Sequence, residues 1–355
     1  MSGAVTGADD LAMLRDAARQ WVGDAGPVEP DPRTARSGIG ARWEAIAGLG
    51  WAGACVAEAS GGLGFGPAAT GALLEALGGT LSTTPLLSTG LIAAQALADR
   101  RDLASAIAAG EWVVAFAIDE GPRHGAPIAT RAERDDAGWR LTGAKRFVLD
   151  APRANRLLVT AQTADGRDLF LVDAAATTIA ALDMIDGREI GDVAFDCAPG
   201  VPLGVGVEGI DRLCDLARTG LASEMLGAAD GALRTTVDYL KLREQFGRPI
   251  GSFQALQHRA AQALCEIELA RSSVAAAWTA AEHGTPDFPA LAALAKYVAG
   301  EAIHRVSSEM VQMHGGIGMT AEHPAGRTLK WARVSETLFG NAAWCAERYA
   351  TLRGF

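Results

Sequence analysis

The stretch REQFGRPIGSFQALQH, Arg243–His258, decides how the second half of the chain folds. The residues before it, 213–243, place apolar side chains three or four apart, which predicts a long helix. Gly247-Arg248-Pro249 then interrupts the helical pattern, and Phe253-Gln254 opens a second helix that continues to residue 283. Because so short a turn joins two long helices, we expect them to be antiparallel neighbours.

A second glycine-containing stretch, QMHGGIGMTAEHPAGR, occupies Gln312–Arg327. It follows a third helical pattern over 288–314 and precedes two shorter helical segments after His323. Long helices with short connections predict a four-helix bundle for this part of the chain. Gly315 and Gly316 have no β-carbon, so their backbone amides could approach an anion closely.

The chain before the bundle divides into two further regions. Residues 112–208 contain short β-like runs, among them WRLTG, RFVL, RLLVTAQ and VAFD, and seven or eight such strands predict a small sandwich or barrel. Asp135-Asp136, Asp165-Gly166 and Ala198-Pro199-Gly200 are the turn signals between them. The first 111 residues have helical periodicity. We therefore predict an α+β, mainly helical fold with an N-terminal helical domain (1–111), a central β domain (112–208) and a C-terminal bundle (209–355).

Charge and composition exclude several kinds of partner. A net charge of -10 with only six histidines provides no basic surface for nucleic acid or for an anionic membrane. No apolar stretch reaches the roughly 18 residues needed to span a bilayer, and residues 1–24 have no signal-peptide core, so we expect a cytoplasmic protein. The five cysteines lack the spacing of metal ligands, and we predict no metal site.

The two glycine-containing stretches resemble signature segments of the acyl-CoA dehydrogenase family and occur in the expected order. WEAIAGLGWAG, GGLGFG and LTGAKRFVLDAPRANRLLV extend the resemblance more weakly over nearly the whole chain. The resemblance implies the family's architecture, which is the one predicted above, and a bundle that forms tetramers. It also implies FAD as cofactor and an acyl-CoA thioester as substrate, oxidised between Cα and Cβ.

The resemblance assigns the cofactor contacts to both stretches. A guanidinium and an aromatic ring at a turn suit a pyrophosphate and a flat adenine. By resemblance, the second stretch would contact the flavin nucleotide of a neighbouring subunit, so function would require an oligomer. The alternative is that Arg243 pairs with a nearby acid while Phe246 and Phe253 fill the core. The predicted cofactor residues are Arg243, Phe246, Phe253, Gln254, Gln312, Gly315 and Gly316.

The catalytic base that this reaction needs is missing from both positions that the family uses. Removal of the α-proton calls for a carboxylate within reach of Cα. Phe339 stands before Gly340 where the family has a glutamate, and Ala217 stands at the second position. Glu224 and Glu336 are the nearest acids in sequence and therefore weak candidates for the base.

Arg218, next to Ala217, matches a position that is basic in many family members. We expect it near the start of the first bundle helix, where it would orient a base or bind substrate. The alternative is a solvated or salt-bridged surface arginine.

These departures leave three functional hypotheses. The segment FAIDEGPRHG replaces the family's threonine-containing segment, and Asn341-Ala342-Ala343 offers a flavin few hydrogen bonds. The first hypothesis is an FAD-dependent acyl-CoA dehydrogenase, as a homo-oligomer or as one chain of a heterotetramer with a homologous subunit. The second is a non-catalytic partner subunit, and the third is a related flavoprotein with different chemistry. The motifs leave the acyl group open, from a bulky sterol-like or aromatic group to a short fatty acyl group.

Overall fold

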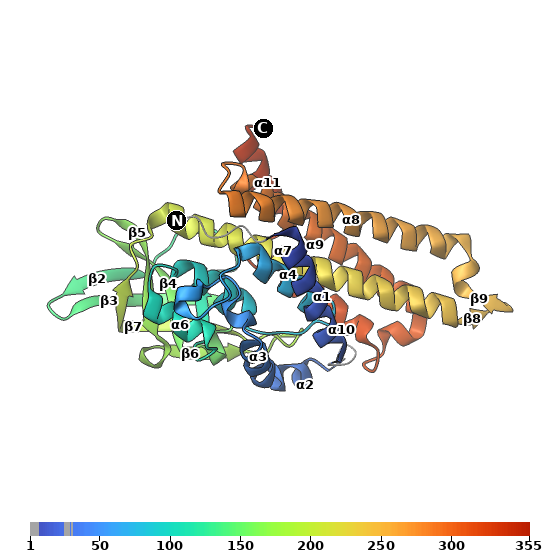
Figure 1. Ribbon diagram of the computed structural model, residues 1–355, viewed down its shortest axis with the longest axis horizontal. Helices are drawn as coiled ribbons and strands as arrows, with labels where there is room; N and C mark the ends of the chain where they lie inside the picture. The colour runs from blue at the N-terminus through green and yellow to red at the C-terminus, as the bar shows by residue number, and fades with distance from the viewer. Residues whose placement is uncertain (1–6, 25–28, 30) are drawn as a thin grey trace.

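The computed structural model describes residues 7–24, 29 and 31–355 and has the predicted order of a helical part, a β part and a bundle (Figure 1). The N-terminal part covers one side of the bundle and adjoins the sheet. Its helices are α1 (Ala8–Asp24), α2 (Pro32–Ser37), α3 (Ile39–Gly48), α4 (Pro67–Gly78), the π-helix η3 (Leu86–Ala93), α5 (Ala94–Ala96) and α6 (Arg101–Ala108).

Seven strands form the β part, and they close into a barrel as predicted. The strand order is β1-β4-β2-β3-β7-β5, and β5 also pairs with β4, so that β4, β2, β3, β7 and β5 form a closed ring. β1 pairs with β4 and β6 pairs with β7 outside this ring. The strands are β1 (Val114–Ala117), β2 (Arg131–Asp135), β3 (Gly138–Leu149), β4 (Arg156–Thr163), β5 (Gly166–Asp173), β6 (Thr178–Leu182) and β7 (Ile190–Pro202).

Two details of the strand prediction were wrong. WRLTG and RFVL, predicted as separate strands, are one strand, β3. The predicted turn Ala198-Pro199-Gly200 lies inside β7, paired with Trp139–Leu141 of β3. A register irregularity beside Cys197, whose φ is +51°, accommodates this segment in the ladder. Turn-forming residues therefore mark an irregular point within a strand here instead of its end.

The C-terminal part is the predicted bundle. Its long helices are α7 (Gly206–Leu242), α8 (Gln254–His283) and α9 (Phe288–His314), and α10 (Pro324–Thr337) and α11 (Ala342–Arg353) pack against α9. A two-stranded hairpin, β8 (Glu244–Gln245) and β9 (Arg248–Pro249), joins α7 to α8 at the end of the bundle far from the barrel (Figure 1).

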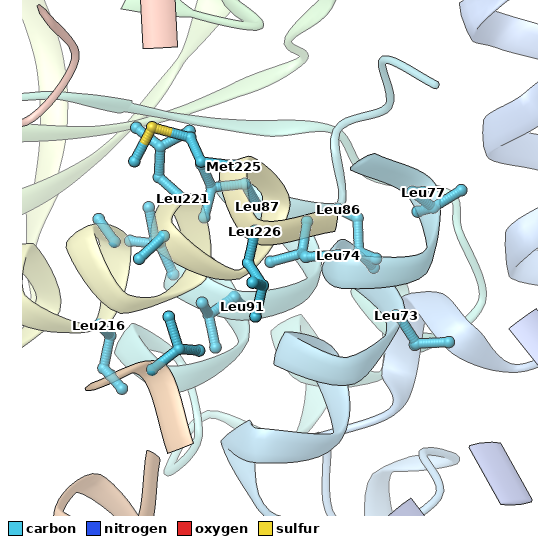
Figure 2. Packing of buried hydrophobic residues seen from close by; sticks show 14 of the residues in the cluster. Leu73, Leu74, Leu77, Leu86, Leu87, Leu91, Leu216, Leu221, Met225 and Leu226 are labelled. Atoms are coloured by element: carbon cyan, nitrogen blue, oxygen red, sulfur yellow. The ribbon is translucent and has the colours of Figure 1, made fainter. Parts of the chain in front are cut away.

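Buried leucines join the N-terminal part to α7. Figure 2 shows leucines of α4 and η3 packed beside Leu216, Leu221, Met225 and Leu226 of α7. Gly220 permits this packing, because a β-carbon there would lie 2.7 Å from Leu87 Cδ1 and 2.8 Å from Leu91 Cδ2. The close contact fixes α7 so that the residues around Ala217 lie in the interior.

None of the helices in the described part of the chain is both long and apolar enough to cross a membrane. Within the same residues, no group of three or more histidine, cysteine, aspartate or glutamate side chains is arranged to hold a metal ion.

Candidate functional site

The predicted cofactor residues gather at one end of the bundle, which we call the motif end and define as the turn Arg243–Gln254 together with Gln312–Gly316. The turn begins at the end of α7, where Arg243 N–H donates a hydrogen bond of 2.8 Å to Tyr239 O. Tyr239 also donates its hydroxyl to His314 O at 3.5 Å, so the end of α7 contacts the end of α9. The structure thus brings together two stretches that lie far apart in sequence.

The side chains of the motif end are open to a ligand. Phe246 is 91% exposed, with a φ of +55°, and its ring meets Phe253 edge to face at 6.1 Å. Arg243 is exposed, and its guanidinium forms no ion pair with the described residues. Gln254 and Gln312 are exposed as well. Arg243 therefore has no acidic partner among the described residues and Phe246 lies outside the core, whereas Phe253 is half-buried.

Two further features of the motif end suit an anionic, planar ligand. A β-carbon added at Gly315 or Gly316 would have no atom within 4 Å, so open space lies in front of this backbone. Arg248, which we did not predict, lies with its guanidinium carbon 4.2 Å from the centroid of the Phe253 ring. A cation on an aromatic face next to accessible backbone is a chemically suitable surface for a nucleotide.

The positions where the family has its base meet at a second region, beside the barrel, which we call the cleft. Phe339 lies in the turn after α10, is 7% exposed and has a φ of +55°. Its carbonyl accepts a hydrogen bond from Arg218 Nε at 3.0 Å, so the turn adjoins Ala217–Arg218 of α7. Both positions are thus in one place, and neither provides an acid.

The prediction that Arg218 lies near a helix start was wrong, and so was the alternative of a surface arginine, although the residue is salt-bridged. It lies well inside α7, because the helix begins at Gly206, and it is 2% exposed. Asp215 pairs with Arg218 at 2.5 Å and with Arg348 of α11 at 3.0 Å. Burial raises the pKa of Asp215, although both arginines oppose that shift. The arginine is a buried link between α7, α11 and the Phe339 turn.

His124 occupies the space in front of Arg218. Its Nε2 lies 2.7 Å from Arg218 Nη2, and its Nδ1 lies 2.9 Å from Asp119 Oδ2. Because a guanidinium can only donate, Nε2 must accept, which leaves Nδ1–H to donate to Asp119. The ring also meets Trp344 at 4.9 Å and Phe339 at 6.4 Å, both edge to face. His124 is thus held at both ring nitrogens and by two aromatic rings of this chain, while it also lines the cavity.

The cleft that remains is small and mostly apolar. Its cavity has a volume of about 270 Å³, and Phe116, Val148, Leu149 and Phe339 are among its lining residues. Asp119 also lines it and is the carboxylate that sequence reasoning missed. Its only signal was the unusual segment FAIDEGPRHG, in which an acid and a histidine stand five residues apart.

The two weak candidates for the base do not line this cavity. Glu224 is buried and pairs with Arg188 at 3.3 Å, and burial raises the pKa of its carboxyl. Glu336 lies near the end of α10, where it contacts Arg333 at 2.6 Å and His304 at 3.2 Å. Each carboxylate is therefore engaged in an ion pair outside the cleft.

Lys296 of α9 holds the Phe339 turn from the other side. Its Nζ donates to the carbonyls of Glu336 and Gly340, each at 3.2 Å. Burial lowers the pKa of Lys296 to about 8. This contact places a cation at the end of α10, where carbonyls lack helical partners.

Two family models match this chain. The family model described as "Acyl-CoA dehydrogenase, C-terminal domain" matches residues 204–349, and "Acyl-CoA dehydrogenase, N-terminal domain" matches residues 8–99. Acyl-CoA dehydrogenase FadE27 of Mycobacterium tuberculosis is 32% identical in an alignment of 324 positions that covers 84% of each chain.

Solved structures are similar over almost the full length. A variant of the Tcur3481-Tcur3483 steroid ACAD is 34% identical, with a TM-score of 0.89 and 98% of each chain covered. The ChsE4-ChsE5 complex from Mycobacterium tuberculosis is 27% identical, with a TM-score of 0.88, and the match covers 100% of this chain and 99% of that one.

Proposed function

Since this chain belongs to the acyl-CoA dehydrogenase family, we propose that it is the subunit of a heteromeric dehydrogenase that helps to bind FAD and has no catalytic base of its own. The family is a flavoprotein family of oxidoreductases acting on CH–CH groups. The reaction is thus FAD-dependent α,β-dehydrogenation of a CoA thioester, carried out by this chain or by an enzyme of which it is a subunit.

The motif end fits part of an FAD molecule. Arg243 is a free cation, Phe246 is a free aromatic face, and open space lies before Gly315 and Gly316. These residues, with Gln312, would hold the nucleotide half of a flavin whose ring lies in a neighbouring chain. Bound FAD supplies a hydride acceptor for the β-carbon of the substrate.

Among the residues that the structure describes, the cleft has no side chain that is free to act as the catalytic base, and this observation is the main support for the proposal. Phe339 and Ala217 cannot take a proton, and Asp119 already accepts from His124. A cavity of about 270 Å³ is also below the usual range of roughly 300–1,000 Å³ for ligand pockets. A dehydrogenase needs a carboxylate free to face the α-carbon. Turnover would therefore depend on a base from another chain.

The proposed partner is a homologous chain with an acid at the position that matches Phe339 or Ala217. Two similar structures have paired names, Tcur3481-Tcur3483 and ChsE4-ChsE5, and the second is named as a complex. In a heterotetramer, the motif end of each chain of this kind would contact the flavin that a partner chain binds. We place this assembly in the cytoplasm and in lipid metabolism as part of the same proposal.

The test is the visible absorbance spectrum of the protein, purified alone and after coexpression with such a homologue. We expect a flavin band only from the coexpressed pair, and bleaching of that band when acyl-CoA thioesters are added anaerobically. A band that bleaches with the chain alone would overturn the proposal. A bound flavin that no thioester bleaches would favour a related flavoprotein with different chemistry.

A further inference from the structure

We propose that Tyr239 is a positioning residue for the flavin site, because it joins the two segments of the motif end. With His314 and His323 it forms a group of aromatic rings that fixes the position of one segment relative to the other. This inference rests on the proposed function and adds residues that do not themselves touch the nucleotide. Sequence analysis assigned none of the three to the site.

Tyr239 contacts both segments through different atoms. Its carbonyl accepts from Arg243 N–H at 2.8 Å, which ends α7 and starts the turn that carries Arg243 and Phe246. Its hydroxyl donates to His314 O at 3.5 Å, directly before Gly315. A movement of Tyr239 would therefore change the distance between the arginine and the glycines.

The ring of Tyr239 is the first member of a stack of three. It lies 4.4 Å from the His314 ring, with 29° between the planes, and the His314 ring lies 4.3 Å from that of His323. His314 is 3% exposed. The Tyr239 and His314 rings are stacked, whereas the His314 and His323 rings are tilted by 48°. Aromatic contacts at these distances are favourable, so the three rings join α7, α9 and the start of α10.

Hydrogen bonds fix both histidine rings. His314 Nδ1 lies 2.7 Å from Met310 O, and because a carbonyl only accepts, this nitrogen must carry the proton. His323 Nδ1 accepts from Ala325 N–H at 3.1 Å and so caps α10. Each contact sets the tautomer and the orientation of its ring.

The turn with the two glycines lies close to His314, the middle residue of this stack. Gly318, in the 3₁₀ turn η7 (Gly315–Met319), is buried, and a β-carbon there would lie 3.0 Å from His314 Cβ. Gly315 has a φ of +62° and a ψ of -138°, a conformation that few other residues adopt. The packing of the turn against His314 thus determines where the exposed amides of Gly315 and Gly316 point.

The experiment compares FAD affinity with thermal stability in the coexpressed assembly. Tyr239→Leu removes the stack and the hydroxyl, and we expect the FAD dissociation constant to rise about tenfold. Tyr239→Phe keeps the ring and should stay within about threefold of wild type. His323→Asn retains a side-chain oxygen to cap α10 but loses its ring, so its dissociation constant should lie between these two.

Tyr297→Leu is the matched control, because this tyrosine lies on α9, is 36% exposed and is outside the stack. FAD is titrated into each deflavinated assembly, and the melting temperature of the flavin-free form is measured in parallel. Affinity should fall in Tyr239→Leu and His323→Asn, while the flavin-free His323→Asn assembly melts within a few degrees of wild type.

Wild-type affinity in both Tyr239→Leu and His323→Asn would overturn this inference and leave the proposed function in place. An equal loss in Tyr297→Leu would overturn it too, since the effect would then be general. A wild-type assembly that takes up no FAD would instead overturn the proposed function, and the inference with it.

Discussion

The motif end and the cleft both involve helices of the bundle, and they differ in whether their side chains are exposed or are paired within the chain. At the motif end, Arg243 and Phe246 are exposed and have no ionic or core partner among the described residues. In the cleft, Arg218 and His124 are buried or nearly so, and each has several partners within the chain. Open polar groups suit a ligand, whereas satisfied ones stabilise the fold.

Under the proposed function, the motif end is the part of a shared flavin site that this chain keeps, whereas the residues of the cleft stabilise the fold. Phe339, His124 and Trp344 fill space beside the turn where the family has its base. Variants in the two regions should therefore have different effects. Those in the cleft should change the free energy of unfolding, and those at the motif end should change FAD affinity.

The largest effect is expected from Arg218→Met in the cleft. The substitution removes the bond to Phe339 O and one of two arginine partners of the buried Asp215, so the free energy of unfolding should fall by about 3 to 5 kcal/mol. Denaturant unfolding of the chain measures this loss. The turnover of assembly that remains folded should match wild type, and a selective loss of turnover would show that the cleft takes part in the chemistry.

Asp150→Asn should stabilise the protein, in a pH-dependent way. Asp150 follows Leu149 of the cleft, accepts from Ser88 Oγ at 2.6 Å, and has a pKa that burial raises to about 7. In the unfolded chain the carboxyl loses its proton near pH 4, whereas in the folded protein it keeps its proton up to about pH 7. The free energy of unfolding of the wild type therefore falls as the pH rises from about 4 to 7. Above pH 7 the full cost of the buried charge remains.

Asparagine keeps the acceptor for Ser88 and tolerates the φ of +62° at this position without carrying the charge. At pH 8 the variant should therefore be more stable than wild type by roughly 2 to 4 kcal/mol, and near pH 4 the two should agree. Thermal or denaturant unfolding across this range measures the difference. A constant difference at all pH values would exclude proton release from Asp150 as its cause.

Arg243→Ala at the motif end should weaken FAD binding to the coexpressed assembly. Loss of one charge-assisted contact costs about 1.5 to 3 kcal/mol, a factor of roughly 10 to 150 in the dissociation constant. Arg234→Ala is the control, because Arg234 is an exposed arginine of α7, the helix that Arg243 follows, and within the described residues its one ion pair is with Asp230. Equal FAD affinity of the Arg243→Ala and Arg234→Ala assemblies would show that the motif end does not bind the flavin.

The smallest effect is expected from Glu336→Gln. Its carboxylate pairs with Arg333 and His304 on a partly exposed face of α10, and such pairs contribute little. Stability should change by no more than about 0.5 kcal/mol, with no change in turnover of the assembly. A large drop in turnover would identify Glu336 as the base and contradict the division between the two regions.

Sequence periodicity predicted the long helices well, because α7, α8 and α9 are long apolar patterns between short connections. α8 buries one stripe of residues, whereas residues 213–229 of α7 are buried on every side. It was less reliable in the barrel. β6 is mostly exposed and, among the strands that the structure describes, pairs with β7 alone, so it carries little hydrophobic signal. Pro199-Gly200 lies within a strand. Strand boundaries depend on partners that a local pattern does not contain.

The motifs predicted which residues would gather at the motif end, but the contacts of the cleft could not be read from them. Arg218 meets His124 and the carbonyl of Phe339 across 94 and 121 residues of chain. Whether an arginine is solvated or buried depends on such distant neighbours. The absence of an acid at Phe339 and Ala217, in contrast, was visible directly in the sequence.

The most direct test of the central claim is an anaerobic acyl-CoA titration of the coexpressed assembly after the partner's matching acid has been changed to its amide. We predict that flavin remains bound, because the motif end is intact, and that its band no longer bleaches, because this chain has no base. Bleaching that persists at the wild-type rate would show that this chain supplies a base and would contradict the account.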